Sequence, residues 1–187
     1  ILTSLYTGCR KGELLALKWE NVDLENKKIY IRQTIRWDRE AGKWEFTSPK
    51  SKESNRVVNI TDDVVEALKL QREKQGFEKA WVGNLWEGDK GETAGLVFAT
   101  KTGLPISQEN LTHRFNNLVE QSGIRRIRYH DIRHSNAPLL RAAGVTEYEL
   151  SKWLGHSQIS VTTKYYGHLY KETLEDAATK LQKLMNE

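Results

Sequence analysis

The chain has 187 residues, of which 29% are charged and 38% hydrophobic, and its formal net charge is +4. This length predicts one domain with a substantial core and leaves little room for a second. No apolar run approaches the roughly 20 residues that a membrane-spanning helix needs, and the N-terminus does not resemble a secretory signal. Cys9 is the single cysteine, which excludes an internal disulfide and a cysteine-based zinc site. We therefore expect a cytoplasmic protein.

The first elements in chain order are two short helices that meet at a glycine turn. Apolar residues at positions 2, 5 and 6 precede a break at Thr7-Gly8, and residues 10–18 have the spacing of a second helix. Arg10 is thus expected in the first turn of that second helix.

Extended segments follow between residues 27 and 60. Apolar and polar residues alternate at 29–35, at 44–46 and again at 57–60, while Ala41-Gly42 has the composition of a turn. These runs predict a small three-stranded antiparallel sheet. Lys50 is expected in or beside the turn between its last two strands.

The remainder is predicted to be mainly helical, which makes the fold class α+β. Thr61 begins a helix that continues to Gly76, residues 77–95 are expected to form a loop or insertion, and residues 96–98 a short strand. Later helices are expected from Ser107, over 131–143, over 147–154 between Thr146 and Gly155, over 161–166, and from 171 to the end.

Two helical segments have features of their own. Pro138 falls inside the helix expected over 131–143, where it should remove a backbone hydrogen bond and favour a kink. The last helix carries an apolar stripe that must be buried against the domain or a neighbour, formed by Leu174, Ala177, Ala178, Leu181 and Leu184.

Four local strings carry residues that could do chemistry. Each has an ordinary explanation by itself: Arg10 could pair with Glu13 on the surface, for example, and Tyr166 could be a core aromatic. Their joint occurrence in one order is far more informative. The strings are Thr-Gly-Cys-Arg at 7–10, Pro-Lys-Ser-Lys at 49–52, His-Asp-Ile-Arg-His at 130–134, and Leu-Gly-His at 154–156 followed by Tyr-Tyr-Gly-His at 165–168.

This ordered set resembles the tyrosine recombinase family, which includes phage integrases and Xer recombinases, over nearly the whole chain. The resemblance implies a tyrosine-recombinase catalytic domain spanning 1–187, a fragment that lacks the N-terminal core-binding domain. It matches family site residues to Arg10, Lys50, His130, Arg133, His156 and Tyr166. Lys50 is the best match for the hairpin lysine, although Lys52 lies two residues away.

The chemistry of phosphodiester cleavage explains why these residue types occur together. Two guanidiniums, from Arg10 and Arg133, can hold the non-bridging oxygens while Tyr166 attacks the phosphorus. A phenol needs a proton acceptor at neutral pH, for which His130 is the candidate. Lys50 would protonate the departing 5′ oxygen, and His156 would donate a hydrogen bond to the phosphate or position its neighbours. Neither metal, cofactor nor ATP is then required.

Three tyrosines lie close together near the end of the chain. The resemblance places the nucleophile directly before Gly-His or a similar pair, which selects Tyr166 over Tyr165 and Tyr170. Adjacent residues on a helix point about 100° apart, so Tyr165 and Tyr166 would not both face the phosphate. We expect Tyr165 to have a packing role.

Two other classes of function fit parts of the same sequence. His130 and His134 flank an aspartate in a relaxed His-Glu-x-x-His zinc pattern, which would indicate a metallohydrolase, although Arg133 would place a fixed positive charge beside the metal. A DNA-binding module without catalysis is the other alternative, but competent residues fill every catalytic position. Type IB topoisomerases share the chemistry, whereas the Leu-Gly-His string and the tail favour a recombinase.

The resemblance also implies partners. Double-stranded DNA is the expected substrate, a homo-tetramer the expected assembly on DNA, and a monomer the expected state of the isolated fragment. In the family, the segment after the nucleophile commonly reaches an adjacent protomer, so we expect the stripe of residues 174–184 to dock in trans.

Overall fold

The structure, a computed structural model, describes residues 1–48, 54–167, 182 and 185. Lys50, Lys52, Tyr170 and the tail stripe lie outside the described residues. Single 3-10 turns occur at Trp19–Asn21, Gly83–Leu85 and Gly91–Thr93. The strands are β1 (Val22–Asp23), β2 (Lys28–Ile31), β3 (Thr34–Asp38), β4 (Lys43–Thr47) and β5 (Arg56–Asn59). The helices are α1 (Leu2–Thr7), α2 (Lys11–Leu15), α3 (Asp62–Val82), α4 (Gln108–Gln121), α5 (Tyr129–Ala142), α6 (Glu147–Leu154) and α7 (Ile159–Tyr166).

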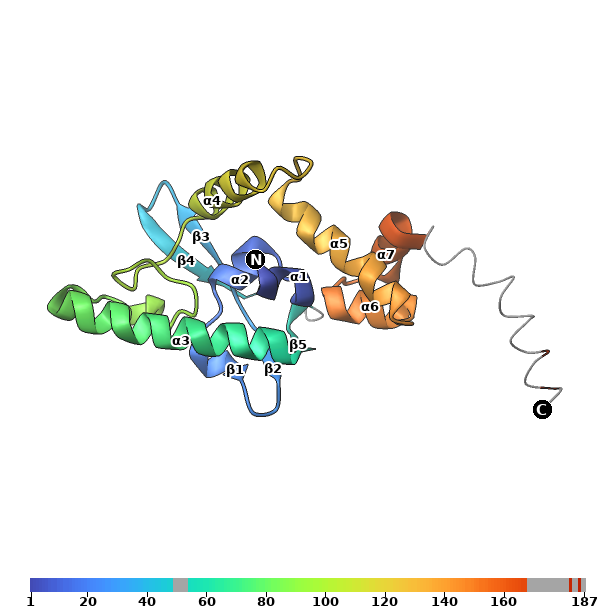
Figure 1. Ribbon diagram of the computed structural model, residues 1–187, viewed down its shortest axis with the longest axis horizontal. Coiled ribbons are helices and arrows are strands. Elements are labelled where there is room, and N and C mark those ends of the chain that lie inside the picture. The colour runs from blue at the N-terminus through green and yellow to red at the C-terminus, as the bar shows by residue number, and fades with distance from the viewer. Residues whose placement is uncertain (49–53, 168–181, 183–184, 186–187) are drawn as a thin grey trace.

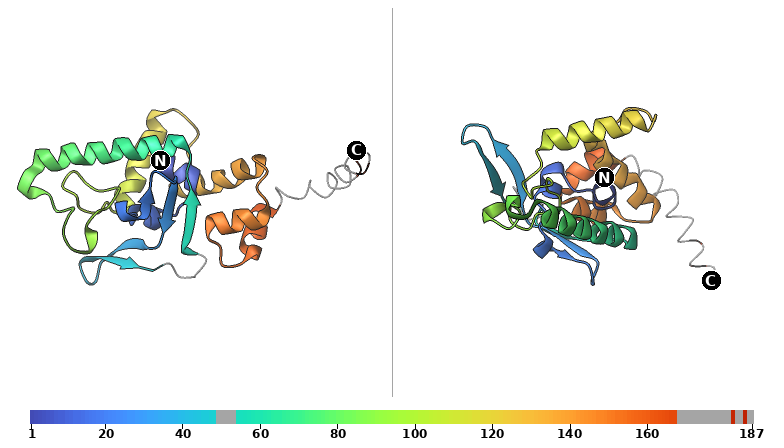
Figure 2. Two further views of the ribbon diagram at one scale, coloured as in Figure 1. Left: turned by 90° about the horizontal axis from the view of Figure 1, so that it is seen from below. Right: turned by 60° about the vertical axis from the view of Figure 1, so that its left-hand side comes forward.

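The elements form a mainly helical α+β arrangement. The short helices α1 and α2 lie between the long helix α3 and helix α4, and α5, α6 and α7 gather at one end of the molecule (Figure 1). The α1 helix packs against both α3 and α5, so it links the two ends. Strands β2 and β5 pack against α3, whereas the β3–β4 hairpin lies against α2 and away from α3 (Figure 2).

The small three-stranded antiparallel sheet is present, but its membership differs from the prediction. It has the order β1-β2-β5, whereas β3 and β4 form a separate two-stranded hairpin around the predicted Ala41-Gly42 turn. The expected run at 29–35 is divided because its isoleucines are buried in two places: Ile29 and Ile31 pack in the cluster with α3, and Ile35 packs with α2 and the hairpin. The chain must bend between Ile31 and Ile35 because these two residues are buried in different clusters.

The helix that begins after Thr61 is longer than predicted. It does not end at Gly76 but continues to Val82, so the predicted loop over 77–95 is wrong for its first six residues. A single glycine costs a helix only about 1 kcal/mol, and Gln75, the residue before it, is held in place by tertiary contacts: its side chain accepts a hydrogen bond from Trp19 Nε1 at 2.7 Å and donates one to the Leu96 carbonyl at 2.9 Å. The helix ends instead at Gly83, whose φ of 54° is favourable for glycine.

The predicted strand at 96–98 is also wrong. Its residues make only an isolated bridge, from Leu96 to Lys18, although Val97 donates a backbone hydrogen bond to the Leu17 carbonyl at 2.8 Å. Leu96 and Val97 are buried, as the pattern indicated, and Phe98 is half-buried; Val97 and Phe98 pack in the cluster that contains residues of α3, but without a ladder. Burial alone therefore did not distinguish a strand from a buried loop.

The later helices follow their predicted signals. Ser107 and Thr146 cap α4 and α6 with side-chain hydrogen bonds, and Gly155 ends α6 in the left-handed conformation. Helix α5 begins at Tyr129, two residues earlier than predicted, because Arg128 and Asp131 form its capping box. Within the described part of the chain, no helix is long and apolar enough to cross a membrane.

Pro138 lies in the interior of α5, which continues through it to Ala142. Proline has no N–H, so the carbonyl of His134 receives no helical hydrogen bond from this position. We expect Pro138→Ala to raise the free energy of unfolding by about 2 kcal/mol. Removal of an interior proline stabilises the helix by about 3 kcal/mol, and about 1 kcal/mol of this is lost because the unfolded chain regains conformational entropy. Urea denaturation measures the change, and an unaltered or reduced free energy would mean that the helix already accommodates the ring.

Candidate active site

The Thr-Gly turn between α1 and α2 positions Arg10. Gly8 caps α1 with a φ of 62°, and a Cβ there would lie 2.8 Å from a methyl group of Leu154 and 3.0 Å from the side-chain oxygen of Asn136. Only glycine satisfies both conditions. The chain therefore turns sharply and places Arg10 at the N-cap of α2, with its side chain 42% exposed.

Arg133 lies at the centre of the site and is only 4% exposed. Its Nη1 donates to the Gly8 carbonyl at 2.5 Å, and its Nη2 donates to the Leu154 carbonyl at 2.6 Å. These two carbonyls belong to the two glycine-containing turns of the sequence motifs, so Arg133 joins them. Burial, followed by the charges of Arg10 and Arg56, lowers the pKa of Arg133 to about 10, which leaves it charged at neutral pH.

A buried ion pair behind Arg10 was not singled out as part of the site from the sequence. Glu13 and Arg56 are both almost fully buried, with Arg56 Nη2 3.0 Å from Glu13 Oε2. The other Glu13 oxygen binds Arg10 Nη1 at 2.8 Å, and Arg56 Nε donates to the Trp153 carbonyl at 2.7 Å. Burial would raise the pKa of Glu13, but Arg56 and Arg10 outweigh it and hold that pKa below its usual value. Glu13 thus orients Arg10 and ties α2 to β5.

The burial of this pair predicts a large effect on stability. Glu13→Gln should lower the free energy of unfolding by about 3–5 kcal/mol, because it leaves the Arg56 charge buried without an anion. Glu45→Gln is a matched control on the exposed Arg36–Glu45 pair, where the loss should stay below about 1 kcal/mol. Urea denaturation compares the two variants, and equal losses would contradict a structural role for Glu13.

His156 follows the turn that ends α6. Its Nδ1 lies 2.8 Å from Oγ1 of Thr162, a fully buried residue of α7. Burial, followed by the charges of Arg133 and Arg10, lowers the pKa of His156 to about 4. The imidazole is therefore neutral at neutral pH and retains one N–H that can be donated to an anion.

Tyr166 ends α7 and is 5% exposed, whereas its neighbour Tyr165 is 54% exposed. Burial raises the pKa of Tyr166, and Arg133 opposes that rise. The Tyr166 hydroxyl lies 2.7 Å from Nδ1 of His134, a residue whose role as a partner of the tyrosine was not predicted. The His-x-x-Arg-His string contained a signal for it, since His134 lies one helical turn after His130.

His130 lies in the first turn of α5 and is exposed. Desolvation of its ring, followed by the proximity of His134 and Arg133, lowers its pKa. The charge of Arg10 acts on both His130 and His156 in the same direction. The structure thus brings Arg10, His130, Arg133, His156 and Tyr166 together, while Lys50 lies outside the described residues.

The arrangement provides cations, neutral imidazoles and a phenol around one position. Such a set can bind an anionic phosphate and support attack by the phenol oxygen. A metal site would need a cluster of His, Cys, Asp or Glu side chains. Among the described residues, no group of three or more of these could hold a metal ion. Asp131, the aspartate of the zinc-like pattern, is bound to Arg128 at 2.9 Å.

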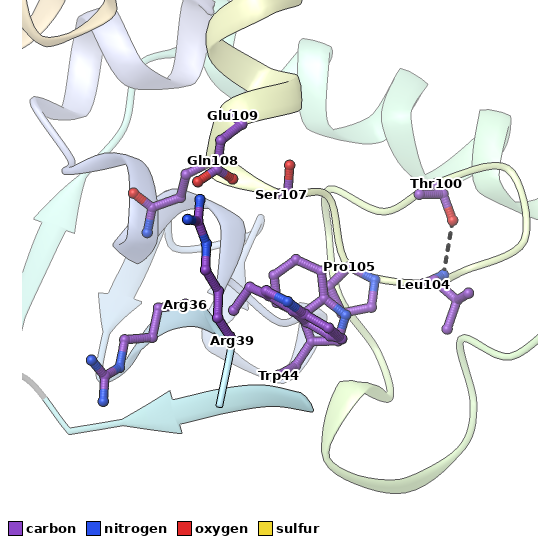
Figure 3. A pocket seen from close by; sticks show the side chains of 10 residues that line it. Arg36, Arg39, Trp44, Thr100, Leu104, Pro105, Ser107, Gln108 and Glu109 are labelled. Atoms are coloured by element: carbon purple, nitrogen blue, oxygen red, sulfur yellow. Dashed lines mark hydrogen bonds between the residues drawn. The ribbon is translucent and has the colours of Figure 1, made fainter. Parts of the chain in front are cut away.

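A separate pocket lies between the β3–β4 hairpin and the start of α4 (Figure 3). The guanidinium of Arg39 points toward Gln108 and Glu109, and Trp44 lies beside Pro105. This pocket contains none of the site residues predicted from the sequence.

Comparison with known proteins identifies relatives whose similarity extends over nearly the whole chain. The sequence profile of the phage integrase family matches residues 1–173. A XerC-like tyrosine recombinase of Caldanaerobacter subterraneus is 33% identical over 98% of this chain and 48% of its own length. The ICEBs1 integrase of Bacillus subtilis is 30% identical over 96% of this chain and 46% of its own length. The chain therefore spans about half the length of the curated relatives it matches.

Solved structures show the same fold at lower sequence identity. The Tn1549 transposon integrase in complex with transposon right end DNA matches with a TM-score of 0.77 and 22% identity, over 98% of this chain and 57% of that one. The XerA recombinase matches with a TM-score of 0.68 and 22% identity, over 96% of this chain and 56% of that one. The fold and the family profile together define the class: this chain belongs to the phage integrase family, the tyrosine recombinases.

Proposed function

We propose that the chain is the catalytic domain of a site-specific DNA recombinase that cleaves and rejoins DNA through a 3′-phosphotyrosine. The observation that carries the proposal is the position of Arg133, which binds the carbonyls of both motif turns and so assembles the site around itself. A buried guanidinium that stays charged at neutral pH is well suited to binding a phosphodiester.

The proposed reaction assigns each residue a role. Arg10 and Arg133 bind the non-bridging oxygens, where charge accumulates as Tyr166 attacks the phosphorus. His156, neutral and with one N–H to donate, adds a hydrogen bond to the same oxygens. Lys50 protonates the departing 5′ oxygen. His130 lies at the edge of the site, and the sequence predicted it as the acceptor of the Tyr166 proton. The phosphotyrosine conserves the bond energy, so a 5′ hydroxyl of a second strand can reverse the reaction without ATP.

Double-stranded DNA is the proposed substrate, and the related Tn1549 transposon integrase has been solved in complex with transposon right end DNA and with a circular intermediate DNA. We propose further that the protein acts as a homo-tetramer on DNA in the cytoplasm, with the isolated chain monomeric. The tail stripe would then dock on an adjacent protomer.

A nicked suicide substrate that carries the junction sequences of the encoding element tests the reaction. The full-length protein should form a covalent adduct that persists in denaturing gels, and it should do so equally in a strong chelator. DNA cleavage that leaves no adduct and stops in chelator would favour the metallohydrolase. DNA binding without any adduct would favour a binding module without catalysis.

Lys50 and Lys52 can be distinguished by a substrate that needs no general acid. Lys50→Ala should slow cleavage of ordinary DNA by roughly a hundredfold or more, the usual size of a general-acid effect. A 5′-bridging phosphorothiolate, whose sulfur leaves without a proton, should restore that rate. Lys52→Ala is the matched control, and rescue of Lys52→Ala in place of Lys50→Ala would move the role by two residues.

A further inference from the structure

The hydroxyl of Tyr166 is bound by a histidine for which the proposed mechanism has no role. Nδ1 of His134 lies 2.7 Å from Tyr166 Oη. On α5, His134 stands one turn after His130, and the two rings pack edge to face with centroids 4.9 Å apart. The ring of His134 also lies 6.2 Å from that of Tyr165. Contacts from α5 and α7 therefore fix the orientation of its imidazole.

The environment of Tyr166 creates a need for a proton acceptor. The tyrosine packs in a cluster with Ala137, Leu150 and Leu154, and this burial raises the pKa of its phenol. A phenol in that state attacks only if a base removes its proton, and the base must lie about 2.6–3.2 Å from the oxygen. His134 meets this distance. It is also only partly buried, so the imidazolium formed can exchange its proton with water.

His130 has a different position relative to the tyrosine. It is exposed, and its contact in this part of the site is the ring of His134. Its pKa is lowered by desolvation, His134 and Arg133, which favours the neutral ring at neutral pH. A neutral His130 adds no positive charge beside the ring of His134.

Resting on the proposed recombinase function, we propose that His134 positions the Tyr166 hydroxyl and accepts its proton when the phenol attacks phosphorus. The O–H bond of Tyr166 breaks as an N–H bond forms at Nδ1 of His134, and the phenol oxygen bonds to phosphorus. The P–O5′ bond breaks, and the departing oxygen takes its proton from the general acid, for which Lys50 is proposed. In the reverse step His134 returns the proton to the released phenol. The sequence assigned this role to His130, whereas the contacts favour His134.

The hydrogen bond can be tested without DNA. In the full-length protein, Tyr166→Phe should shift the ¹⁵N resonance of His134 Nδ1, because the partner oxygen is removed. His113, which is exposed on α4, serves as the control and should not shift. An unchanged His134 resonance would overturn the positioning role.

The proton transfer is tested by two substitutions in a single-turnover cleavage assay. His134→Phe keeps an aromatic ring, and His134→Asn keeps a polar group near the Nδ1 position without its basicity. Both should slow cleavage at least about a hundredfold, with DNA affinity and melting temperature unchanged. Full activity of His134→Asn would overturn proton acceptance and leave positioning alone, and full activity of His134→Phe would overturn both roles.

A ring-fluorinated tyrosine at position 166 gives an independent readout, because fluorine makes the phenol more acidic. It should restore much of the rate lost in His134→Phe but little of that lost in Arg10→Ala, where the phosphate contact is missing. No recovery in His134→Phe would overturn proton acceptance. If the wild-type protein forms no adduct at all, the proposed function fails, and the role of His134 fails with it. If the wild-type protein and the His134 variants are all active, the role of His134 is overturned and the proposed recombinase function stands.

Discussion

Replacing Tyr166 with phenylalanine should abolish covalent attachment to a nicked substrate. The substitution removes the nucleophilic oxygen and keeps the ring that packs against Ala137, Leu150 and Leu154. DNA affinity should therefore remain unchanged, and the free energy of unfolding should fall by only about 1 kcal/mol, the net value of one hydrogen bond. Denaturing gels measure the adduct and gel shifts measure the affinity.

Tyr165→Phe is the matched control for this result. Tyr165 is exposed, and its variant should form the adduct at the wild-type rate. An adduct that persists in Tyr166→Phe and maps to Tyr165 or Tyr170 would show that the nucleophile has been misassigned.

The two arginines should both be essential for cleavage, but their losses should differ in their effect on the fold. Arg10→Ala should slow cleavage by roughly 10²–10³, by analogy with the loss of one oxyanion donor. Its side chain is partly exposed, and Glu13 keeps its partner Arg56, so the melting temperature should change little. Arg133→Ala should slow cleavage at least as much and also destabilise the protein, because the carbonyls of Gly8 and Leu154 lose their donor.

Lysine at either position separates charge from geometry. Arg10→Lys keeps the positive charge but lacks the planar pair of donors, so it should recover DNA affinity more than cleavage rate. Single-turnover rates and thermal denaturation of Arg10→Ala, Arg10→Lys, Arg133→Ala and Arg133→Lys provide the comparison. Near-normal cleavage in Arg10→Ala or Arg133→Ala would contradict the phosphate-binding role of that arginine.

The candidate site shows how far local sequence signals extend. Arg10 and Arg133 were identified because each stands at a fixed offset from a turn or a helix start, and such offsets are visible in a single sequence. Glu13 was visible only as a possible surface partner of Arg10. Its burial with Arg56 depends on two segments 43 residues apart, and no local pattern reports that distance.

The same distinction applies to His134. Its position one turn after His130 was evident from the string, and that spacing supported a relaxed zinc motif as well as a recombinase. Contact with Tyr166, 32 residues later, favours a partner of the phenol over a metal ligand. That contact exists because α7 packs on α6, which brings the end of α7 against α5.

The sequence by itself determined where α4 and α6 begin and where α6 ends, since the caps Ser107, Thr146 and Gly155 act through hydrogen bonds within one turn. It also determined the order of the motif residues and hence the family. Only the tertiary structure decided which strands pair, because Ile31 and Ile35 are buried in separate clusters. It likewise decided that α3 continues past Gly76, where Gln75 binds Trp19 and the Leu96 carbonyl. These outcomes depend on contacts between distant segments, whose energies exceed the weak local preference of a glycine or an alternating run.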